Sequence, residues 1–221
     1  LVHTSSPSVA HAGGDIEGGD ESLPYPDVFH AAYPATKALA EQRVIAANGP
    51  GLATVSLRPH LIWGPGDPHL LPRLLERAAR GSIALPGGDK LIDTVYVENA
   101  AEAHLLALDA LREGRPVGGK VYFITNDDPR PQKEIIGSLL RAAGVDVQIK
   151  SIPPAIASAA GRLLESGYRL LRIQAEPPVT RWSAEQLSTA HWYDISAAKR
   201  DLGYRPRISI EEGLELLRSS S

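Results

Sequence analysis

Two patterns of apolar and polar positions alternate along this chain, one typical of strands and one typical of helices. Short apolar runs rich in β-branched residues, bounded by glycine, proline or polar residues, predict buried strands. These runs cover residues 1–9, 52–59, 120–126 and 147–152. Longer stretches with apolar residues three and four positions apart predict amphipathic helices. They cover residues 29–48, 69–80, 100–111 and 132–143. Strands that alternate with helices are typical of an α/β protein with a parallel sheet.

Two segments between these elements carry mixed signals. Residues 11–27 contain paired glycines and several prolines, which predicts a loop over the mouth of the site at the sheet edge. Its acidic residues read as a solvated surface run, and they are Asp15, Glu17, Asp20 and Glu21. Asn99 and Glu102 are spaced as in a capping box, so we expect Asn99 to cap the helix that follows.

Residues 154–173 predict a further helix with a single charged stripe. The charges of this stripe are Arg162, Glu165, Arg169 and Arg172. Four charges in such a short segment exclude a membrane span. Three interpretations stay open: a core helix, a wall of an apolar substrate pocket, or a surface helix that makes peripheral contact with lipid.

Composition narrows the class of protein. The chain has 221 residues, 43% of them hydrophobic, and a net charge of −3, so neither nucleic acid nor an anionic membrane is an expected partner. It contains no cysteine, which excludes disulfides and cysteine-ligated zinc and fits a cytoplasmic protein. The seven histidines show no metal-ligand spacing, so no metal site is expected.

The candidate chemistry lies at Tyr33 and Lys37. In the helix predicted over residues 29–48 they are one turn apart on the same face. An ammonium fixed beside a phenol stabilises the phenolate, and a serine hydroxyl facing the same point can hold a carbonyl oxygen. The serine pair Ser5 and Ser6 ends the first predicted strand, where a parallel sheet exposes its ligand-binding edge. The plainer alternative is a chance Tyr-x-x-x-Lys in an ordinary helix.

A strand-end serine followed by Tyr33-Pro-Ala-Thr-Lys37 resembles the short-chain dehydrogenase/reductase superfamily. The segments Arg58-Pro-x-x-Ile-Trp-Gly-Pro-Gly-Asp67 and Leu202-Gly-Tyr-x-Pro206 narrow the resemblance to its extended members, of the 3β-hydroxysteroid dehydrogenase type. This implies the C-terminal portion of a doubly wound Rossmann fold with a smaller α/β substrate lobe. We expect residues 1–64 and 91–126 in the dinucleotide-binding domain, and residues 65–90 and 127–221 in the lobe.

The same resemblance implies a role for each matching residue. The catalytic group would be Ser6, Tyr33 and Lys37. Tyr33 and Lys37, with Pro59 and Ile62, would contact the nicotinamide cofactor. Ser8, His60 and Trp63 would face the substrate, although Trp63 could equally be a packing aromatic residue. His60 is a departure, because arginine is expected there in close relatives.

Within this branch the motifs are most similar to bacterial reductases of 2-alkyl-3-oxoalkanoates. The resemblance implies NADP-dependent reduction, with NAD as the alternative, of the 3-keto group of a long-chain, hydrophobic keto acid. It further implies a homodimer that could assemble with other enzymes of its pathway. Three alternatives stay open: a 3β-hydroxysteroid or sterol dehydrogenase, a nucleotide-sugar epimerase, and a non-catalytic remnant or binding module.

The first residue lies inside a predicted strand, and no Gly-x-Gly-x-x-Gly turn occurs in the chain. A Rossmann fold places that phosphate-binding turn about 100 residues earlier, so we expect a preceding segment that carries it. Residues 1–221 alone are expected to self-associate through the first strand and to bind no cofactor.

Overall fold

The computed structural model describes residues 1–153, 155–157, 159, 163, 166, 168 and 187–220. Most of the helix predicted over residues 154–173 therefore lies outside the described residues, as does the segment that joins it to residue 187.

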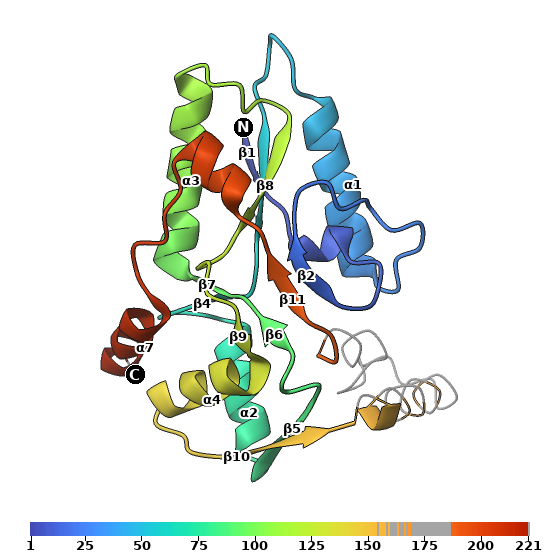
Figure 1. The fold of residues 1–221 in the computed structure, drawn as a ribbon, viewed down its shortest axis with the longest axis vertical. Helices are drawn as coiled ribbons and strands as arrows, with labels where there is room; N and C mark the ends of the chain where they lie inside the picture. Colours follow the sequence, from blue (N-terminus) through green and yellow to red (C-terminus); the bar gives the residue numbers. More distant parts are fainter. Residues whose placement is uncertain are drawn as a thin grey trace.

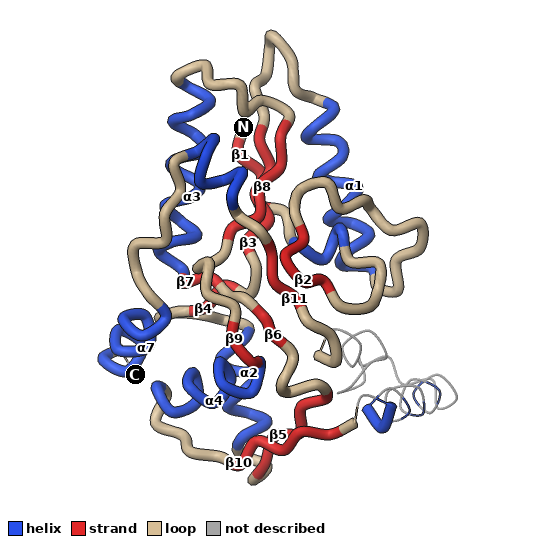
Figure 2. The backbone as a smooth tube through the Cα atoms, viewed as in Figure 1, coloured by secondary structure: helices blue, strands red, loops and turns tan. Residues whose placement is uncertain are grey.

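A parallel sheet of three strands forms the upper part of the molecule in Figure 1, with the order β1-β3-β8. The strands are β1 (Val2–Thr4), β3 (Val55–Pro59) and β8 (Lys120–Ile124). All residues of β3 are buried, as expected for a central strand covered on both faces. Helices α1 (Ala32–Ala46) and α3 (Val97–Arg112) flank this sheet on opposite sides, so the predicted α/β class is confirmed (Figures 1 and 2).

Smaller sheets connect this upper part to the lower one. Strand β4 (Ile62–Trp63) pairs in parallel with β7 (Val95–Tyr96). A mixed sheet has the order β2-β11-β6-β9. Its strands are β2 (Ile16–Gly19), β11 (His191–Tyr193), β6 (Leu91–Ile92) and β9 (Arg130–Pro131).

The lower part pairs β5 (Ser82–Pro86) in parallel with β10 (Gln148–Ile152), next to helices α2 (Leu70–Ala78) and α4 (Gln132–Ala142). Helix α7 (Ile210–Ser219) packs against α4. Two short helical turns complete the described elements, the 3-10 turn η1 (Pro7–Ala10) and the π-helical turn η2 (Ala198–Leu202). Apart from the helix predicted over residues 154–173, the helices and strands predicted from periodicity are thus present, most with shifted ends.

Two large apolar clusters fill these parts, and a small third one lies between η1 and α1. The first lies between the central sheet and α3, and the second joins α2, α4, α7 and β5. Residues Tyr193 to Tyr204 contribute to the first cluster, although the predicted domain boundaries assign them to the second domain. The cause is η2, which packs against α3 and β8. The domain boundaries as a whole stay a prediction.

Two local predictions were wrong. Residues 16–19 form strand β2 rather than loop, because they pair with β11 from the other end of the chain. The first strand ends at Thr4, since Pro7 starts η1. The acidic run is exposed at Asp15, Glu17 and Asp20, as predicted, whereas the half-buried Glu21 accepts a hydrogen bond from the Phe123 amide at 2.9 Å.

Asn99 is also not the helix cap that its spacing predicts. The N-cap of α3 is Tyr96, which places Asn99 within the first turn. The Asn99 side chain, 1% exposed, instead donates to Asn126 and to the Ile208 carbonyl oxygen, and accepts from the amides of Arg207 and Ile208. It joins the C-terminal segment to the sheet edge.

Candidate active site

A cavity of about 890 Å³ opens at the carboxyl ends of β1 and β3, where a parallel sheet presents ligand sites. All the residues predicted for the site line this one cavity, and they are Ser6, Ser8, Tyr33, Lys37, Pro59, His60, Ile62 and Trp63. The fold thus brings these eight residues together, whereas the role of each residue stays a prediction.

Helix α1 brings Tyr33 and Lys37 to the cavity. Lys37 Nζ donates to the Thr4 carbonyl oxygen at 2.9 Å, which fixes the ammonium at the end of β1. The Tyr33 side chain is 51% exposed and therefore open to a ligand. Thr36 directs its hydroxyl back to the Ala32 and Tyr33 carbonyl oxygens, so it serves the helix rather than the cavity.

The serine predicted to hold a carbonyl is fixed by the turn that follows it. Ser6 caps η1, and its Oγ accepts from the Ser8 amide at 3.3 Å and lies 3.0 Å from Ser8 Oγ. Pro7 at the start of the turn sets the backbone direction. Ser5 is buried at 4% exposure, which leaves Ser6 as the more accessible hydroxyl of the pair.

Asp93 is a functional candidate that the sequence analysis missed. Its carboxylate is 1% exposed, and Oδ1 lies 2.7 Å from His60 Nδ1 while Oδ2 accepts from the Tyr193 amide at 2.8 Å. Burial raises the pKa of Asp93, and the bonds from His60 and Tyr193 oppose that rise. The Asp-x-x-Tyr segment that follows β6 could have drawn attention to Asp93. The contact with His60 could not be predicted, because the two residues are 33 positions apart in the sequence.

Next to His60 a second histidine is held neutral. The His191 ring is stacked 6.2 Å from that of His60. Burial, with the charges of His60 and His11, lowers the pKa of His191 to about 3. The Tyr193 ring meets His60 edge-on at 5.3 Å and stacks on Phe123 at 4.2 Å. These rings leave His60 little freedom to turn.

The turn after β3 forms another wall of the cavity. Trp63 is 2% exposed, donates to Thr94 Oγ1 at 3.0 Å and meets Tyr96 edge-on, so its surroundings match the packing alternative. Gly64 has φ 147°, and a Cβ there would approach Val97 Cγ1 to 2.6 Å, which requires glycine. Ile62 is more open, and its contact with a nicotinamide stays a prediction.

Beneath α1 lies a buried ion pair that the sequence analysis also missed. Arg58, 2% exposed, donates to both carboxylate oxygens of Glu41, which is fully buried. Tyr25 Oη donates to the same carboxylate at 2.7 Å. Burial alone would raise the pKa of Glu41, but the bonds and charge of Arg58 outweigh it and the pKa is lowered. The pair fixes α1 to β3 behind the site.

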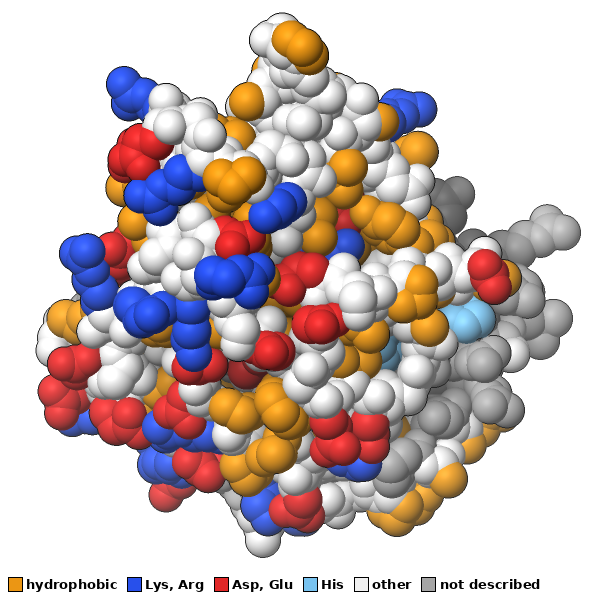
Figure 3. Space-filling view, turned by 45° about the horizontal axis from the view of Figure 1, so that its top comes forward, with side chains coloured by type: hydrophobic (Ala, Val, Ile, Leu, Met, Phe, Trp, Pro, Cys, Tyr) orange, Lys and Arg blue, Asp and Glu red, His pale blue; other side chains and the backbone are white. Residues whose placement is uncertain are grey.

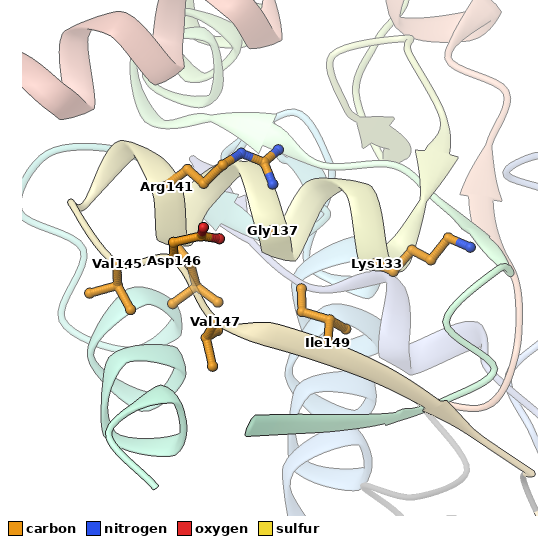
Figure 4. A pocket seen from close by; sticks show the side chains of 8 residues that line it. Lys133, Gly137, Arg141, Val145, Asp146, Val147 and Ile149 are labelled. Atoms are coloured by element: carbon orange, nitrogen blue, oxygen red, sulfur yellow. The ribbon is translucent and has the colours of Figure 1, made fainter. Parts of the chain in front are cut away.

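Other parts of the described surface carry less chemistry. A hollow of about 240 Å³ between α4 and β10 is lined by aliphatic residues together with Lys133, Arg141 and Asp146, and it contains none of the predicted site residues (Figure 4). On the face drawn in Figure 3 acidic and basic side chains are interspersed. Within the described residues no cluster of metal-ligating side chains is found, and no described helix is long and apolar enough to cross a membrane.

Comparison with known proteins adds a family to this geometry. Residues 1–153 match the model of the 3-beta hydroxysteroid dehydrogenase/isomerase family. The chain is 52% identical over its whole length to a 2-alkyl-3-oxoalkanoate reductase of Stenotrophomonas maltophilia, of which it covers 68%. It is 47% identical to the protein of that name from Shewanella oneidensis and covers 59% of it. A mouse sterol-4-alpha-carboxylate 3-dehydrogenase is 35% identical over 97% of the chain, which covers 61% of that protein. The chain thus spans roughly three fifths to two thirds of these relatives.

Solved structures agree on the fold. RMD from Pseudomonas aeruginosa, complexed with NADPH, matches 99% of the chain with a TM-score of 0.64 at 19% identity, and the match covers 65% of that structure. A UDP-glucuronic acid 4-epimerase from Bacillus cereus, in complex with NAD, matches 99% with a TM-score of 0.66 at 19% identity and covers 60% of that structure. At these identities the likeness establishes the fold alone.

Proposed function

The chain belongs to the 3-beta hydroxysteroid dehydrogenase/isomerase family, within the extended short-chain dehydrogenases, and on that premise we propose that it reduces a 2-alkyl-3-oxoalkanoic acid to the 3-hydroxy acid. The observation that carries this proposal is the meeting of Ser6, Tyr33 and Lys37 at one cavity. A hydroxyl, a phenol and a fixed ammonium are the groups that a carbonyl reduction needs. A non-catalytic binding module has no need of this combination.

The cavity fits the nicotinamide end of a dinucleotide. Its volume of about 890 Å³ lies within the range of about 300–1,000 Å³ that is usual for small-molecule sites. Lys37 offers an ammonium for ribose hydroxyls, and Pro59 and Ile62 offer an apolar surface for a ring. When bound, the reduced dinucleotide would supply the hydride. We propose NADPH, with NADH as the alternative.

The side chains of the cavity then act on the ketone oxygen. Ser6 donates a hydrogen bond to this oxygen, and Tyr33 gives it a proton as negative charge develops there. Lys37 stabilises the phenolate that Tyr33 becomes. These interactions accelerate the reaction because they bind charge that is present in the transition state and absent from the ketone. The bond from Lys37 to Thr4 at 2.9 Å keeps the ammonium in place throughout.

The names of two kinds of relative support the substrate class. In a 2-alkyl-3-oxoalkanoate the carboxylate is attached to the carbon next to the reacting carbon, and the same holds for a sterol-4-carboxylate that reacts at carbon 3. Apolar side chains that line the cavity suit the alkyl part, among them Leu61, Ile62 and Val97, which are 36–39% exposed. A sterol carboxylate is therefore the second candidate.

The test is turnover by the protein expressed from its full gene. NADPH and NADH oxidation would be followed with a synthetic 2-alkyl-3-oxoalkanoic acid and with a 3-oxo sterol 4-carboxylate, and the hydroxy acid identified by mass spectrometry. Tyr33→Phe is expected to lower turnover by about 10²–10⁴-fold. Tyr122→Phe is the matched control, because its hydroxyl bonds Asp201 away from the cavity, and it should leave turnover unchanged.

Three results would contradict the proposal. They are the absence of a hydroxy acid product, a Tyr33→Phe enzyme close to the wild type, and a clear preference for the sterol carboxylate. The last of these would establish the second candidate instead.

A further inference from the structure

His60 stands at the cavity with one edge of its ring bound and the other free. Nδ1 faces Asp93 Oδ1 at 2.7 Å. Within the described residues Nε2 has no hydrogen-bond partner. It is also not one of the buried side-chain nitrogen or oxygen atoms that lack a partner, so it is accessible to solvent. The His60 side chain is 13% exposed, and the residue lines the cavity. A ligand in the cavity can therefore reach Nε2.

The surroundings of His60 hold the ring in this orientation. The His60 amide donates to the Ile124 carbonyl oxygen at 3.1 Å, which extends the pairing of β3 with β8. The rings of His191 and Tyr193 pack against the imidazole. Asp93 in turn is fixed by the Tyr193 amide at 2.8 Å, so the carboxylate cannot turn away from Nδ1. A ring held so firmly suits recognition of one ligand group.

The charges around the cavity favour an anion. Among the described lining residues the permanent charges are Lys37, Arg73 and Asp67. The Asp67 carboxylate accepts from the amides of His69, Leu70 and Leu71 at 2.7–3.1 Å, so its oxygens are already engaged at the start of α2. Asp93 lies behind His60 rather than in the lining, so its carboxylate holds Nδ1 without facing the ligand.

We propose that His60 binds the carboxylate of the substrate through Nε2–H, and that Asp93 is the positioning residue that keeps the His60 ring oriented for this contact. The proposal rests on the proposed function and adds the group that distinguishes an acid from a neutral ketone. His60 directly follows Pro59, the predicted nicotinamide contact. That neighbourhood suits a carboxylate one carbon away from the reacting centre.

The experiment compares an acid with its neutral counterpart. A 3-oxo acid with its carboxylate on the next carbon loses CO₂ readily, so the assay runs in the direction of oxidation, with NADP⁺ and the stable 2-alkyl-3-hydroxy acid. The counterpart is its methyl ester. The readout is the ratio of kcat/KM for the acid to kcat/KM for the ester, with KM and kcat reported separately. The wild type is expected to favour the acid by at least about tenfold, as for a hydrogen bond to a charged group.

Three variants separate recognition from stability. His60→Gln should lower the acid-to-ester ratio by about 10–100-fold, mainly through KM for the acid, whereas His60→Arg, which restores a cation, should keep much of it. Asp93→Asn should lower the ratio as well, since the carboxamide replaces the carboxylate oxygen that holds Nδ1 and so loosens the orientation of the ring. His30→Gln is the matched control, because His30 is exposed and does not line the cavity, and its ratio should equal that of the wild type.

The outcomes distinguish this proposal from the proposed function. A wild type that oxidises acid and ester equally well would overturn the role of His60 and leave the reductase proposal standing. The same holds if His60→Gln weakens both substrates equally, since a structural role predicts that result. Absence of turnover with both substrates would overturn both proposals. If Asp93→Asn fails to fold, the two His60 variants still decide whether the contact exists.

Discussion

Breaking the buried pair of Glu41 and Arg58 from one side should destabilise the protein more than breaking any exposed ion pair of the described chain. Glu41→Gln keeps the shape of the side chain but leaves the Arg58 guanidinium, 2% exposed, without its counter-charge. Breaking a buried pair from one side typically costs about 3–5 kcal/mol, and Gln retains one acceptor, so we expect about 3 kcal/mol. For a protein of this size that corresponds to a fall in Tm of about 6–12 °C.

Chemical denaturation monitored by fluorescence measures this loss. Glu76→Gln is the matched control, because it also removes a helical glutamate from an arginine, Arg80, but both side chains are about two-thirds exposed. Exposed pairs contribute about 0–1 kcal/mol, so the control should be nearly silent. Replacing both members, Glu41→Leu with Arg58→Met, should recover much of the stability because no buried charge remains. A Glu41→Gln protein whose free energy of unfolding lies within about 1 kcal/mol of the wild type would show that the buried guanidinium does not need its counter-charge.

Three further results are expected. Lys37→Met should weaken dinucleotide binding in a fluorescence titration and also slow turnover, since one ammonium is predicted to serve both; normal cofactor affinity would contradict this. Burial lowers the pKa of His191 from 6.5 to about 3, so only the unfolded chain takes up this proton as the pH falls between these values. Stability should therefore drop by up to about 1.4 kcal/mol per pH unit there, less steeply in His191→Gln, and parallel pH curves for the two proteins would disprove it. Gly213→Ala should cost about 1–3 kcal/mol, because its Cβ would meet two buried aromatic rings at 2.7 and 2.8 Å. Gly137→Ala, on the similar helix α4, meets mainly a flexible arginine and should gain up to about 1 kcal/mol in thermal unfolding, so equal effects of the two would exclude the steric cause.

Much of the candidate site could be predicted because its residues depend on local rules. Tyr33 and Lys37 are one helical turn apart, and the helix that carries them exists. Ser6 lies two residues after the end of β1, and Pro59 is the last residue of β3. The carboxyl ends of parallel strands meet at one sheet edge. Each of these placements follows from a period or from the direction of a strand, which a sequence contains.

Contacts between distant segments could not be predicted in the same way. Glu41 and Arg58 meet only because α1 packs across β3, and neither residue differs from a surface charge in the sequence. Strand β2 contains two glycines and gains its strand character from pairing with β11, so tertiary structure overrides a local loop signal. Asn99 has the spacing of a cap, but the start of α3 at Val97 directs its amide to the C-terminal segment.

Two candidate functional side chains are held from behind by a group of another element or turn. Lys37 is held by the Thr4 carbonyl oxygen, and His60 is held by Asp93. Asp93 contacts His60, which lines the cavity, whereas Glu41 contacts Arg58, which does not. Loss of Asp93 should therefore change which substrate is preferred, while loss of Glu41 should change only how much folded protein is present. The geometry thus assigns two buried carboxylates to two separate measurable effects, specificity for the first and stability for the second.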